Sequence, residues 1–383
     1  MLPELSAAQA QHSAAVTRAV KAAIERGGGW LAFDDYLRIV LYAPGLGYYS
    51  AGSPKFGSGG DFVTAPELSG LFARCLANQC AQVLRCVGGD VLEFGAGTGR
   101  LAAGVLSRLA ELDQLPEHYY VLEVSADLRA RQRETLAELP TAIGSRVQWL
   151  DTLPAVPITG VILANEVADA LPFQRFVIDA GCVYERGVGV CRQAALIDAD
   201  RPASEALCAE LGRIAPQAWP PRYLSELCPM LDAWIAAIAA ALSRGALLLI
   251  DYGLPRHEYY HPQRDQGTLR CHFRHRAHDD PLRYPGVQDI TAWVDFTRVA
   301  EAAVEAQLEV AGYCTQAAFL LATGIESALA AATGTTQRAR LAAQARMLLL
   351  PGEMGEHFKV MALRRGFDEP LCGFVHQDLR RSL

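Results

Sequence analysis

The chain has 383 residues, of which 51% are hydrophobic and 20% are charged, the composition of a folded protein with one large domain or two ordinary ones. Its formal net charge of −7 argues against a protein that acts mainly by nonspecific nucleic-acid binding. The ten cysteines form no Cys-x-x-Cys pair, no apolar run approaches the ~20 residues of a membrane span, and no secretory leader is recognisable. We therefore expect a reduced, cytoplasmic protein.

The N-terminal part is expected to be helical. Its pattern predicts helices over residues 1–28, 30–42 and 68–87, with an ordered loop rich in Gly, Pro, Ser and Tyr over 43–66. In that loop, Pro66 followed by Glu67 fits a helix start, and capping alone explains the pair without any catalytic role.

Strands and helices alternate from residue 91 onward. Short apolar strands are predicted over 91–95, 119–125, 147–150, 161–164, 246–251, 308–315 and 358–363, with helices over 101–112 and 126–139. This alternation indicates a mainly parallel sheet covered on both faces. Two long segments depart from it. Residues 173–242 contain a predicted hairpin around 179–181 followed by helices, and residues 254–289 show little strand or helix period.

The segment from Val91 to Leu101 predicts a buried strand, a glycine-rich turn and a helix start. Gly95, Gly97 and Gly99 let the backbone turn sharply and approach a ligand closely. The following helix aims free N–H groups at that ligand, which favours a carboxylate or a phosphate. The G-x-G-x-x-G fingerprint of dinucleotide enzymes would need glycine at position 100, which is arginine. The alternative is a tight turn with no ligand.

Acidic residues follow several of the predicted strands. Glu123 ends the second strand and can accept hydrogen bonds from ribose hydroxyls, unless it is an ordinary strand-end carboxylate. After the fourth strand, Asn165, Glu166 and Asp169 come close together, and the two carboxylates share a face if that turn is helical. They could grip a guanidinium or withdraw a proton, and helix capping is the alternative. Asp251 ends the fifth strand, where it either faces the ligand crevice or forms a turn.

The polar segment after Asp251 is rich in histidine and arginine. Its members are His257, His261, Arg264, Arg270, His272, Arg274, His275, Arg276 and His278. Cys271 beside these histidines raises the possibility of a metal site, but the spacing matches no standard zinc motif. We therefore expect no metal and favour a substrate-binding loop, with a merely solvated loop as the alternative.

Together these motifs give the chain its resemblance to a known family. They are Tyr48-Tyr49-Ser50, GDFVTAPE (60–67), EFGAGTGRLA (93–102), LEVS (122–125), ANEVADALPFQRF (164–176), DYG (251–253) and DITAWVDFT (289–297). The chain resembles the MidA-like S-adenosylmethionine (SAM)-dependent methyltransferases, which include a mitochondrial protein-arginine methyltransferase. One departure is Trp293, which stands where many members carry histidine.

The resemblance implies the α/β class I methyltransferase fold. This is a Rossmann-like, mainly parallel seven-stranded sheet with an N-terminal helical extension and helical and loop insertions. Residues 1–87 would form the extension and a loop covering the cofactor. Residues 88–383 would form the methyltransferase domain, with insertions at about 173–245 and 254–290.

The resemblance also implies SAM as the cofactor and assigns the site residues. The expected SAM-binding residues are Asp61, Thr64, Glu67, Glu93, Gly95, Gly97, Gly99, Glu123 and Val124. The expected catalytic residues are Asn165, Glu166, Asp169 and Asp251.

The sequence thus predicts a methyltransferase that acts on a protein side chain, arginine first. We expect a monomer or homodimer whose partner is a protein substrate, with no nucleic-acid or membrane partner. Two alternatives remain open: a small-molecule O- or N-methyltransferase, and a SAM-binding assembly or scaffold protein with little turnover.

Overall fold

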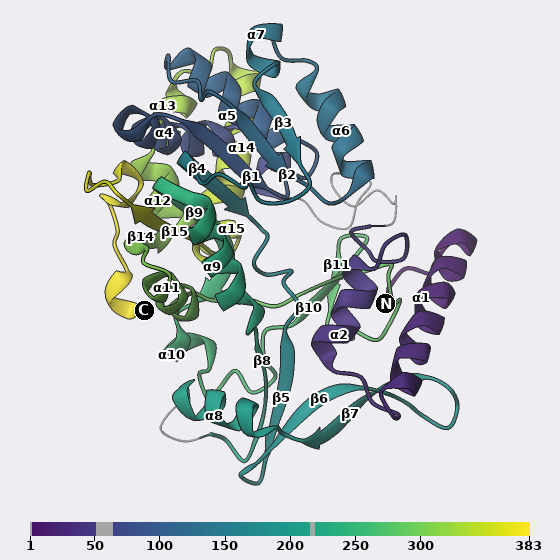
Figure 1. The fold of residues 1–383 in the computed structure, drawn as a ribbon. Helices are drawn as coiled ribbons and strands as arrows, with labels where there is room; N and C mark the ends of the chain where they lie inside the picture. The colour runs from purple at the N-terminus through teal and green to yellow at the C-terminus, as the bar shows by residue number, and fades with distance from the viewer. Residues whose placement is uncertain (1, 51–63, 215–218) are drawn as a thin grey trace. The chain divides into compact units, whose positions relative to one another are not determined.

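The computed structural model describes residues 2–50, 64–214 and 219–383 (Figure 1). The chain divides into two compact units. The sheet unit comprises Val63–Ala168, Asp232–Gly253 and Phe296–Leu383, and the accessory unit comprises Met1–Phe62, Asp169–Leu231 and Leu254–Asp295. Each unit is described by itself. The predicted boundary at residue 87 follows a different division and stays a prediction.

The sheet unit contains the strand alternation that the sequence predicts. Its seven strands pair in the order β14-β15-β9-β4-β1-β2-β3. They are β1 (Asp90–Phe94), β2 (Tyr119–Leu122), β3 (Val147–Leu150), β4 (Ile158–Asn165), β9 (Leu242–Leu254), β14 (Glu309–Thr315) and β15 (Phe358–Arg365). All neighbouring pairs are parallel except the two made by β15, which runs antiparallel to β9 and β14. The expected α/β fold with a mainly parallel central sheet is confirmed.

The central strands are mostly apolar because helices cover both faces of the sheet. On one face, Val161, Leu248 and Val360 join a buried cluster with α4 and α5. On the other face, Phe94 packs edge-to-face on Trp234 of α9, with ring centroids 5.7 Å apart. This packing supplies the apolar burial that stabilises the unit.

Helices of the sheet unit connect and flank these strands (Figure 1). They are α3 (Ala65–Leu68), α4 (Gly70–Val87), α5 (Arg100–Glu111), α6 (Ala126–Leu136), α7 (Thr141–Gly144), α9 (Met230–Ala241), α11 (Phe296–Glu305), α12 (Gln316–Ala322), α13 (Ile325–Ala330), α14 (Thr335–Leu349), α15 (Met354–His357) and the short 3₁₀ turns η2 (Cys372–Phe374) and η3 (Arg380–Ser382). Pro66 lies in the first turn of α3, as the sequence predicts.

Strand order reverses at β1, which lies between β2 and β4 in the sheet. In open α/β sheets, ligands bind outside the carboxyl ends of the strands at such a switch point. The turn after β1 begins at Gly95 and the turn after β4 begins at Glu166. The topology therefore places both predicted motifs at the same edge of the sheet.

The accessory unit contains two smaller antiparallel sheets. Its elements are α1 (Ala7–Arg26), α2 (Phe33–Leu37), the π-helical turn η1 (Arg38–Tyr42), β5 (Gln174–Asp179), β6 (Cys182–Val190), β7 (Leu196–Pro202), α8 (Glu205–Ile214), β8 (Arg222–Leu227), α10 (Arg256–Tyr259), β10 (Arg270–Phe273), β11 (Arg276–His278), β12 (Asp289–Thr291) and β13 (Val294–Asp295). The sheets have the strand orders β7-β6-β5-β8 and β11-β10-β12.

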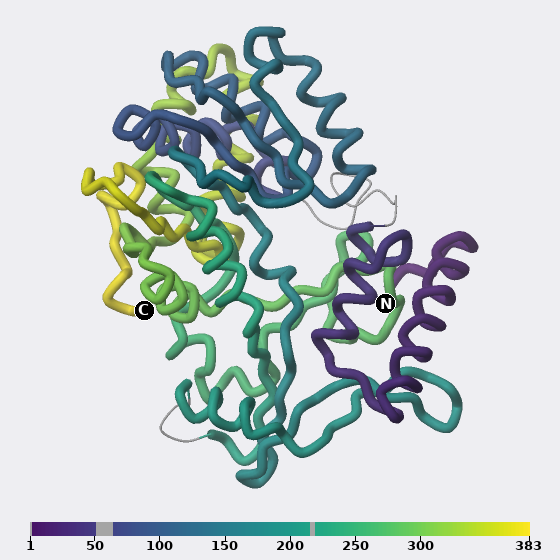
Figure 2. Tube along the Cα trace, viewed as in Figure 1, coloured from purple at the N-terminus to yellow at the C-terminus, as the bar shows by residue number. Residues whose placement is uncertain are grey.

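The two departures from the strand alternation are more ordered than the sequence predicts. The hairpin around residues 179–181 is confirmed, with positive φ at Ala180 and Gly181, but β7 and β8 complete a four-stranded sheet where helices were expected. Residues 254–289, whose sequence shows little strand or helix period, hold the strands β10 and β11 of the second sheet. Figure 2 traces residues 173–231 and 254–289 through the accessory unit. None of the described helices is both long enough and apolar enough to cross a bilayer.

Candidate active site

The glycine turn of the sheet unit follows β1 directly. Gly95, Gly97 and Gly99 have φ values of 58°, 53° and 87°, in the left-handed region that favours glycine. The N–H of Gly95 donates to the Leu122 carbonyl at 3.0 Å, which ties the turn to the end of β2. Gly99 caps the N-terminus of α5, a helix of 12 residues. The turn therefore presents a helix N-terminus, which attracts a carboxylate or phosphate.

Glu123 lies beside this turn at the end of β2 and is only 5% exposed. Its Oε1 accepts from the backbone N–H of Ser125 at 2.8 Å, and its Oε2 accepts from Nε2 of Gln132 at 3.1 Å. The same Nε2 donates to the Gly97 carbonyl at 3.0 Å. Gln132 therefore links the Glu123 carboxylate to the glycine turn.

Gln132 is a residue that the sequence pattern does not single out. It is fully buried on α6, and its Oε1 accepts from Nε1 of Trp149 at 2.9 Å. The one sequence signal for Gln132 is its place on the same face of α6 as the apolar residues Leu128 and Leu136. Gly99 also packs closely here, since a Cβ at Gly99 would lie 3.1 Å from the Gln132 Cα.

Two further predicted cofactor residues lie at opposite extremes of exposure. Val124 is 77% exposed directly after Glu123, where an apolar side chain is available to contact a flat ring. Glu93 is 2% exposed, and its Oε2 accepts from the Tyr119 hydroxyl at 2.7 Å. Burial raises the pKa of Glu93 to about 7. Glu93 is therefore held inside the sheet unit by Tyr119, two residues before the glycine turn begins.

The segment before α4 also reaches the glycine turn. Glu67 on α3 accepts from the Thr98 hydroxyl, and its other oxygen lies 3.3 Å from Nε of Arg100. Thr64 precedes α3 and is 8% exposed. Asp61 lies outside the described residues. Glu67 thus holds two residues of the turn.

The turn after β4 has an unusual backbone. Glu166 has a φ of 54°, so this turn is not helical, and the condition under which Glu166 and Asp169 would share a helix face is not met. A left-handed conformation at a non-glycine residue costs roughly 1–2 kcal/mol and persists only where its surroundings fix it. The N–H of Glu166 donates to the Ile250 carbonyl at 2.9 Å, which anchors the turn to β9.

Asp251 also holds the turn after β4 in place. It is fully buried, and its Oδ2 accepts from the N–H groups of Val167 at 3.3 Å and Ala168 at 3.0 Å. Its Oδ1 accepts from the N–H of Tyr252 at 3.0 Å. The Asp251 carboxylate therefore binds the backbone beside Glu166.

The turns after β1 and β4 meet at the switch point. A Cβ added at Gly95 would lie 3.7 Å from Cγ2 of Val167, an ordinary van der Waals contact. Nδ2 of Asn165 donates to Oε1 of Glu166 at 3.1 Å. Oδ1 of Asn165 is buried and has no hydrogen-bond partner among the described residues. A buried acceptor of this kind can accept a hydrogen bond from a bound ligand.

Asp169 belongs to the accessory unit and is described there. It is 6% exposed, and its carbonyl accepts from the N–H of Ala292 at 3.1 Å. Burial raises the pKa values of Tyr42 and Tyr49. The nearby charges of Asp289 and Asp169 raise them further. The Tyr49 hydroxyl donates to Oδ1 of Asp289 at 2.7 Å. The sequence motifs around residues 48 and 289 therefore gather at Asp169.

Trp293 lies beside the hydrophobic core of the accessory unit that contains Phe176 and Tyr260. It packs against that core, its N–H donates to the Thr268 hydroxyl at 3.1 Å, and the Arg264 guanidinium lies 5.0 Å from its ring centroid. These contacts give Trp293 a structural role within the accessory unit.

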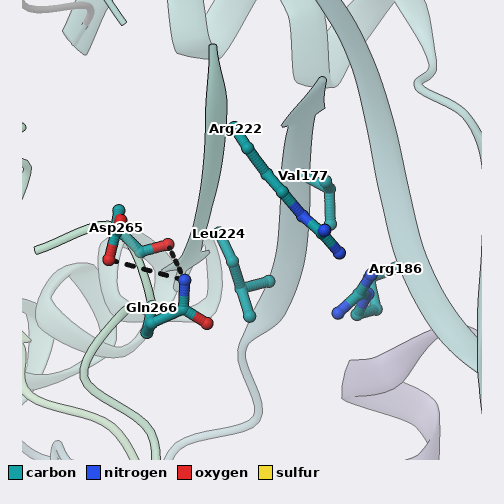
Figure 3. Close-up of a pocket in the computed structure, with 6 residues that line it drawn as sticks. All are labelled: Val177, Arg186, Arg222, Leu224, Asp265 and Gln266. Atoms are coloured by element: carbon teal, nitrogen blue, oxygen red, sulfur yellow. Dashed lines mark hydrogen bonds between the residues drawn. The ribbon is translucent and has the colours of Figure 1, made fainter. Parts of the chain in front are cut away.

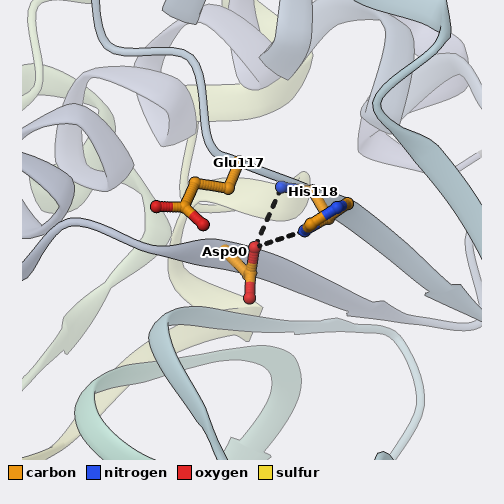
Figure 4. Close-up of side chains that lie close together, drawn as sticks. All are labelled: Asp90, Glu117 and His118. Atoms are coloured by element: carbon orange, nitrogen blue, oxygen red, sulfur yellow. Dashed lines mark hydrogen bonds and ion pairs between the residues drawn. The ribbon is translucent and has the colours of Figure 1, made fainter.

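The histidine-rich segment does not assemble a metal-binding group among the described residues. Burial lowers the pKa of His272, which keeps its ring neutral. The one group of three described His, Cys, Asp or Glu side chains close enough to share an ion is Asp90, Glu117 and His118 (Figure 4). It lies where β1 and β2 begin, at the end of the strands opposite the glycine turn. Asp90 accepts there from the N–H and Nδ1 of His118 at 2.9 and 3.2 Å.

Comparisons with known proteins agree with this geometry. Residues 75–314 match the model of the Methyltransf_28 family of S-adenosyl-L-methionine-dependent methyltransferases. A COG1565 superfamily member from Burkholderia thailandensis, solved bound to S-adenosyl-homocysteine, is 45% identical with a TM-score of 0.95, and the match covers 100% of both chains. A native structure of a COG1565 protein from the same organism is 44% identical with a TM-score of 0.93, again over 100% of both chains.

Animal relatives match over most of their length. The zebrafish (Danio rerio) mitochondrial protein arginine methyltransferase NDUFAF7 is 28% identical over 88% of this chain and 83% of its own. The human protein of the same name is also 28% identical, over 88% of this chain and 80% of its own.

The described residues fit the cofactor that these comparisons indicate. The left-handed glycine turn leaves room for a ligand, and a buried carboxylate is fixed beside it by Gln132. The chain therefore belongs to the MidA-like family of class I methyltransferases, and its cofactor is SAM.

Proposed function

We propose that this methyltransferase transfers the methyl group of SAM to an arginine side chain of a protein. The observation that carries the proposal is the pair of acceptor groups at the turn after β4. The orphaned Oδ1 of Asn165 lies beside the carboxylate of Glu166, and this turn contacts the glycine turn through Val167. A guanidinium offers five N–H donors and matches such a set of oxygens. The names of the animal relatives support the same acceptor.

The residues divide the work as follows. SAM supplies a methyl group activated by its positively charged sulfur. Gly95, Gly97 and Gly99 make room for the cofactor, and Glu123 holds its ribose. Glu67 and Thr64 support the turn, with Asp61 and Val124 proposed as further contacts. Positioning of this kind lowers reaction barriers by roughly 7–11 kcal/mol.

On the acceptor side, Glu166 and Asn165 orient the guanidinium by accepting its N–H groups. The nitrogen lone pair forms the new N–CH₃ bond, the S–CH₃ bond breaks, and the nitrogen gives up a proton. We assign that proton to the Glu166 carboxylate, with Asp169 sharing the charge. A guanidinium is otherwise almost never deprotonated in proteins, so its carboxylate partners must localise the lone pair. Asp251 is a positioning residue, because its oxygens bind the backbone beside Glu166.

Mass spectrometry of protein from a strain that lacks this chain tests the acceptor. The proposal expects a methylarginine peptide in wild-type cells that is missing from the deletion strain and returns when the wild-type chain is restored. A deletion strain with an unchanged protein methylation pattern and a missing methylated small molecule would overturn the arginine assignment. The cytoplasmic location expected from the sequence stays a prediction, since the animal relatives bear names that place them in mitochondria.

A further inference from the structure

The four-stranded sheet of the accessory unit has two unlike faces. Side chains alternate along a strand, so Phe176 and Ile178 of β5 point away from Val177. They join Tyr223 of β8 in a core with Leu207 and other residues of α8. The other face carries Val177 directly across from Leu224 of β8. Helix α8 packs against the face of Phe176 and Ile178, not against the face that carries Val177.

A pocket of about 290 Å³ lies on this second face (Figure 3). Its lining residues are Val177, Arg186, Arg222, Leu224, Asp265 and Gln266. Val177 and Leu224 form an apolar floor between polar groups. The segment that carries Asp265 and Gln266 is fixed to the sheet, because the N–H of Leu224 donates to the Asp265 carbonyl at 2.9 Å.

The two arginines of the pocket differ in their partners. Arg186 donates from Nε and Nη2 to the carboxylate of Asp200 at 2.7 and 2.8 Å, so its charge is matched. The Arg222 guanidinium has no hydrogen-bond or ion-pair partner among the described residues, although Asp179 lies across from it on β5. Figure 3 shows its side chain extending past Val177 toward Arg186. A free guanidinium beside a second one favours an anion.

The shape and polarity of the pocket narrow the ligand further. Its volume is near the lower end of ligand pockets, about 300 Å³, which suits one amino-acid side chain with its backbone. A short alkyl segment would cover the Val177–Leu224 floor while a carboxylate reached Arg222. The Asp265 carboxylate accepts from Nε2 of Gln266 at 3.4 Å and has further lone pairs that can accept the N–H of a peptide bond. A glutamate within a polypeptide has all three features.

We propose that this pocket binds an acidic side chain, glutamate foremost, of the protein that carries the methyl acceptor. The identity of that protein as the partner rests on the proposed function, while the pocket chemistry does not. The site thus contributes to substrate selection through residues of the accessory unit alone.

Ligand-observed saturation-transfer NMR on the full chain tests the proposal. The probe is N-acetylglutamate N-methylamide, and N-acetylglutamine N-methylamide is its neutral control. The glutamate probe should bind about tenfold more tightly than the glutamine probe, because only the carboxylate forms a charge-assisted bond with the guanidinium. Arg222→Gln should remove that difference. Arg192→Gln, in the turn between β6 and β7 and outside the pocket, should keep it.

Three results would overturn the inference. These are equal binding of the two probes, an equal loss in both variants, or tighter binding of free glutarate, which would assign the pocket to a small acid. The measurement needs neither SAM nor methyl transfer. A failure to methylate arginine would therefore leave the NMR result standing, and the reverse also holds.

Discussion

Replacing Asp251 by asparagine tests how the turn after β4 is held. The wild-type carboxylate is fully buried and accepts three backbone N–H groups, two of them at Oδ2. Asparagine keeps the oxygen that serves Tyr252 but turns an NH₂ group toward the N–H groups of Val167 and Ala168. Each lost hydrogen bond to a charged group is worth about 1.5–3 kcal/mol. We expect Asp251→Asn to lower the free energy of unfolding by roughly 3–5 kcal/mol.

The same change should reduce turnover more than cofactor binding. The left-handed backbone of Glu166 loses its support, so the carboxylate is no longer held in one place, whereas Glu123 and the glycine turn are untouched. Urea denaturation, calorimetric SAM titration and methyl-transfer rates, all at low temperature, measure the three effects. The matched control is Asp90→Asn at the start of β1, where the amide oxygen of asparagine can still accept from the N–H of His118. A stability loss no larger than that of the control, with unchanged turnover, would refute the reasoning.

Two further predictions concern residues around the glycine turn. Gly97→Arg should abolish SAM binding, measured by calorimetry. The control Gly181→Arg places the same side chain at another glycine with positive φ and should bind SAM normally. SAM binding that survives in Gly97→Arg contradicts the assignment of the glycine turn. Glu93→Gln should become relatively more stable as pH rises. Burial raises the pKa of Glu93 from its ordinary 4.5 to about 7, so its contribution is complete below about 4.5 and is lost as pH rises through 7. Urea denaturation near pH 5 and pH 8 should show the difference between variant and wild type shifting by roughly 3 kcal/mol toward the variant, and a constant difference would contradict the burial argument.

Much of the sheet unit could be predicted from sequence because its signals are local. Apolar runs such as the one at 246–251 are typical of strands buried on both faces, and the glycine spacing requires a specific turn. The four-stranded sheet of the accessory unit was missed in part because β7 is mostly exposed and polar, with charged side chains along an edge. Its pairing depends on long-range contacts that no local pattern reveals.

The site shows the same division between local and tertiary information. The chemical types at Glu123 and Glu166 could be recognised from their places after strands. The support of these residues could not, because Gln132 and Asp251 act through contacts with backbone far away in sequence. The non-helical turn at Glu166 could not be foreseen either, since non-glycine residues seldom adopt a positive φ and only the surrounding structure imposes it.

The central claim is that Glu166 lies beside the cofactor turn and directs methyl transfer to arginine. Its most direct test incubates the wild-type chain and Glu166→Gln with methyl-labelled SAM and protein from a strain that lacks the enzyme, followed by acid hydrolysis and amino-acid mass spectrometry. We predict labelled methylarginine with the wild-type chain and at least a hundredfold less with Glu166→Gln, about 2.7 kcal/mol of barrier, at nearly unchanged SAM affinity. Equal methylarginine from both proteins, or label on any other amino acid, would contradict the account.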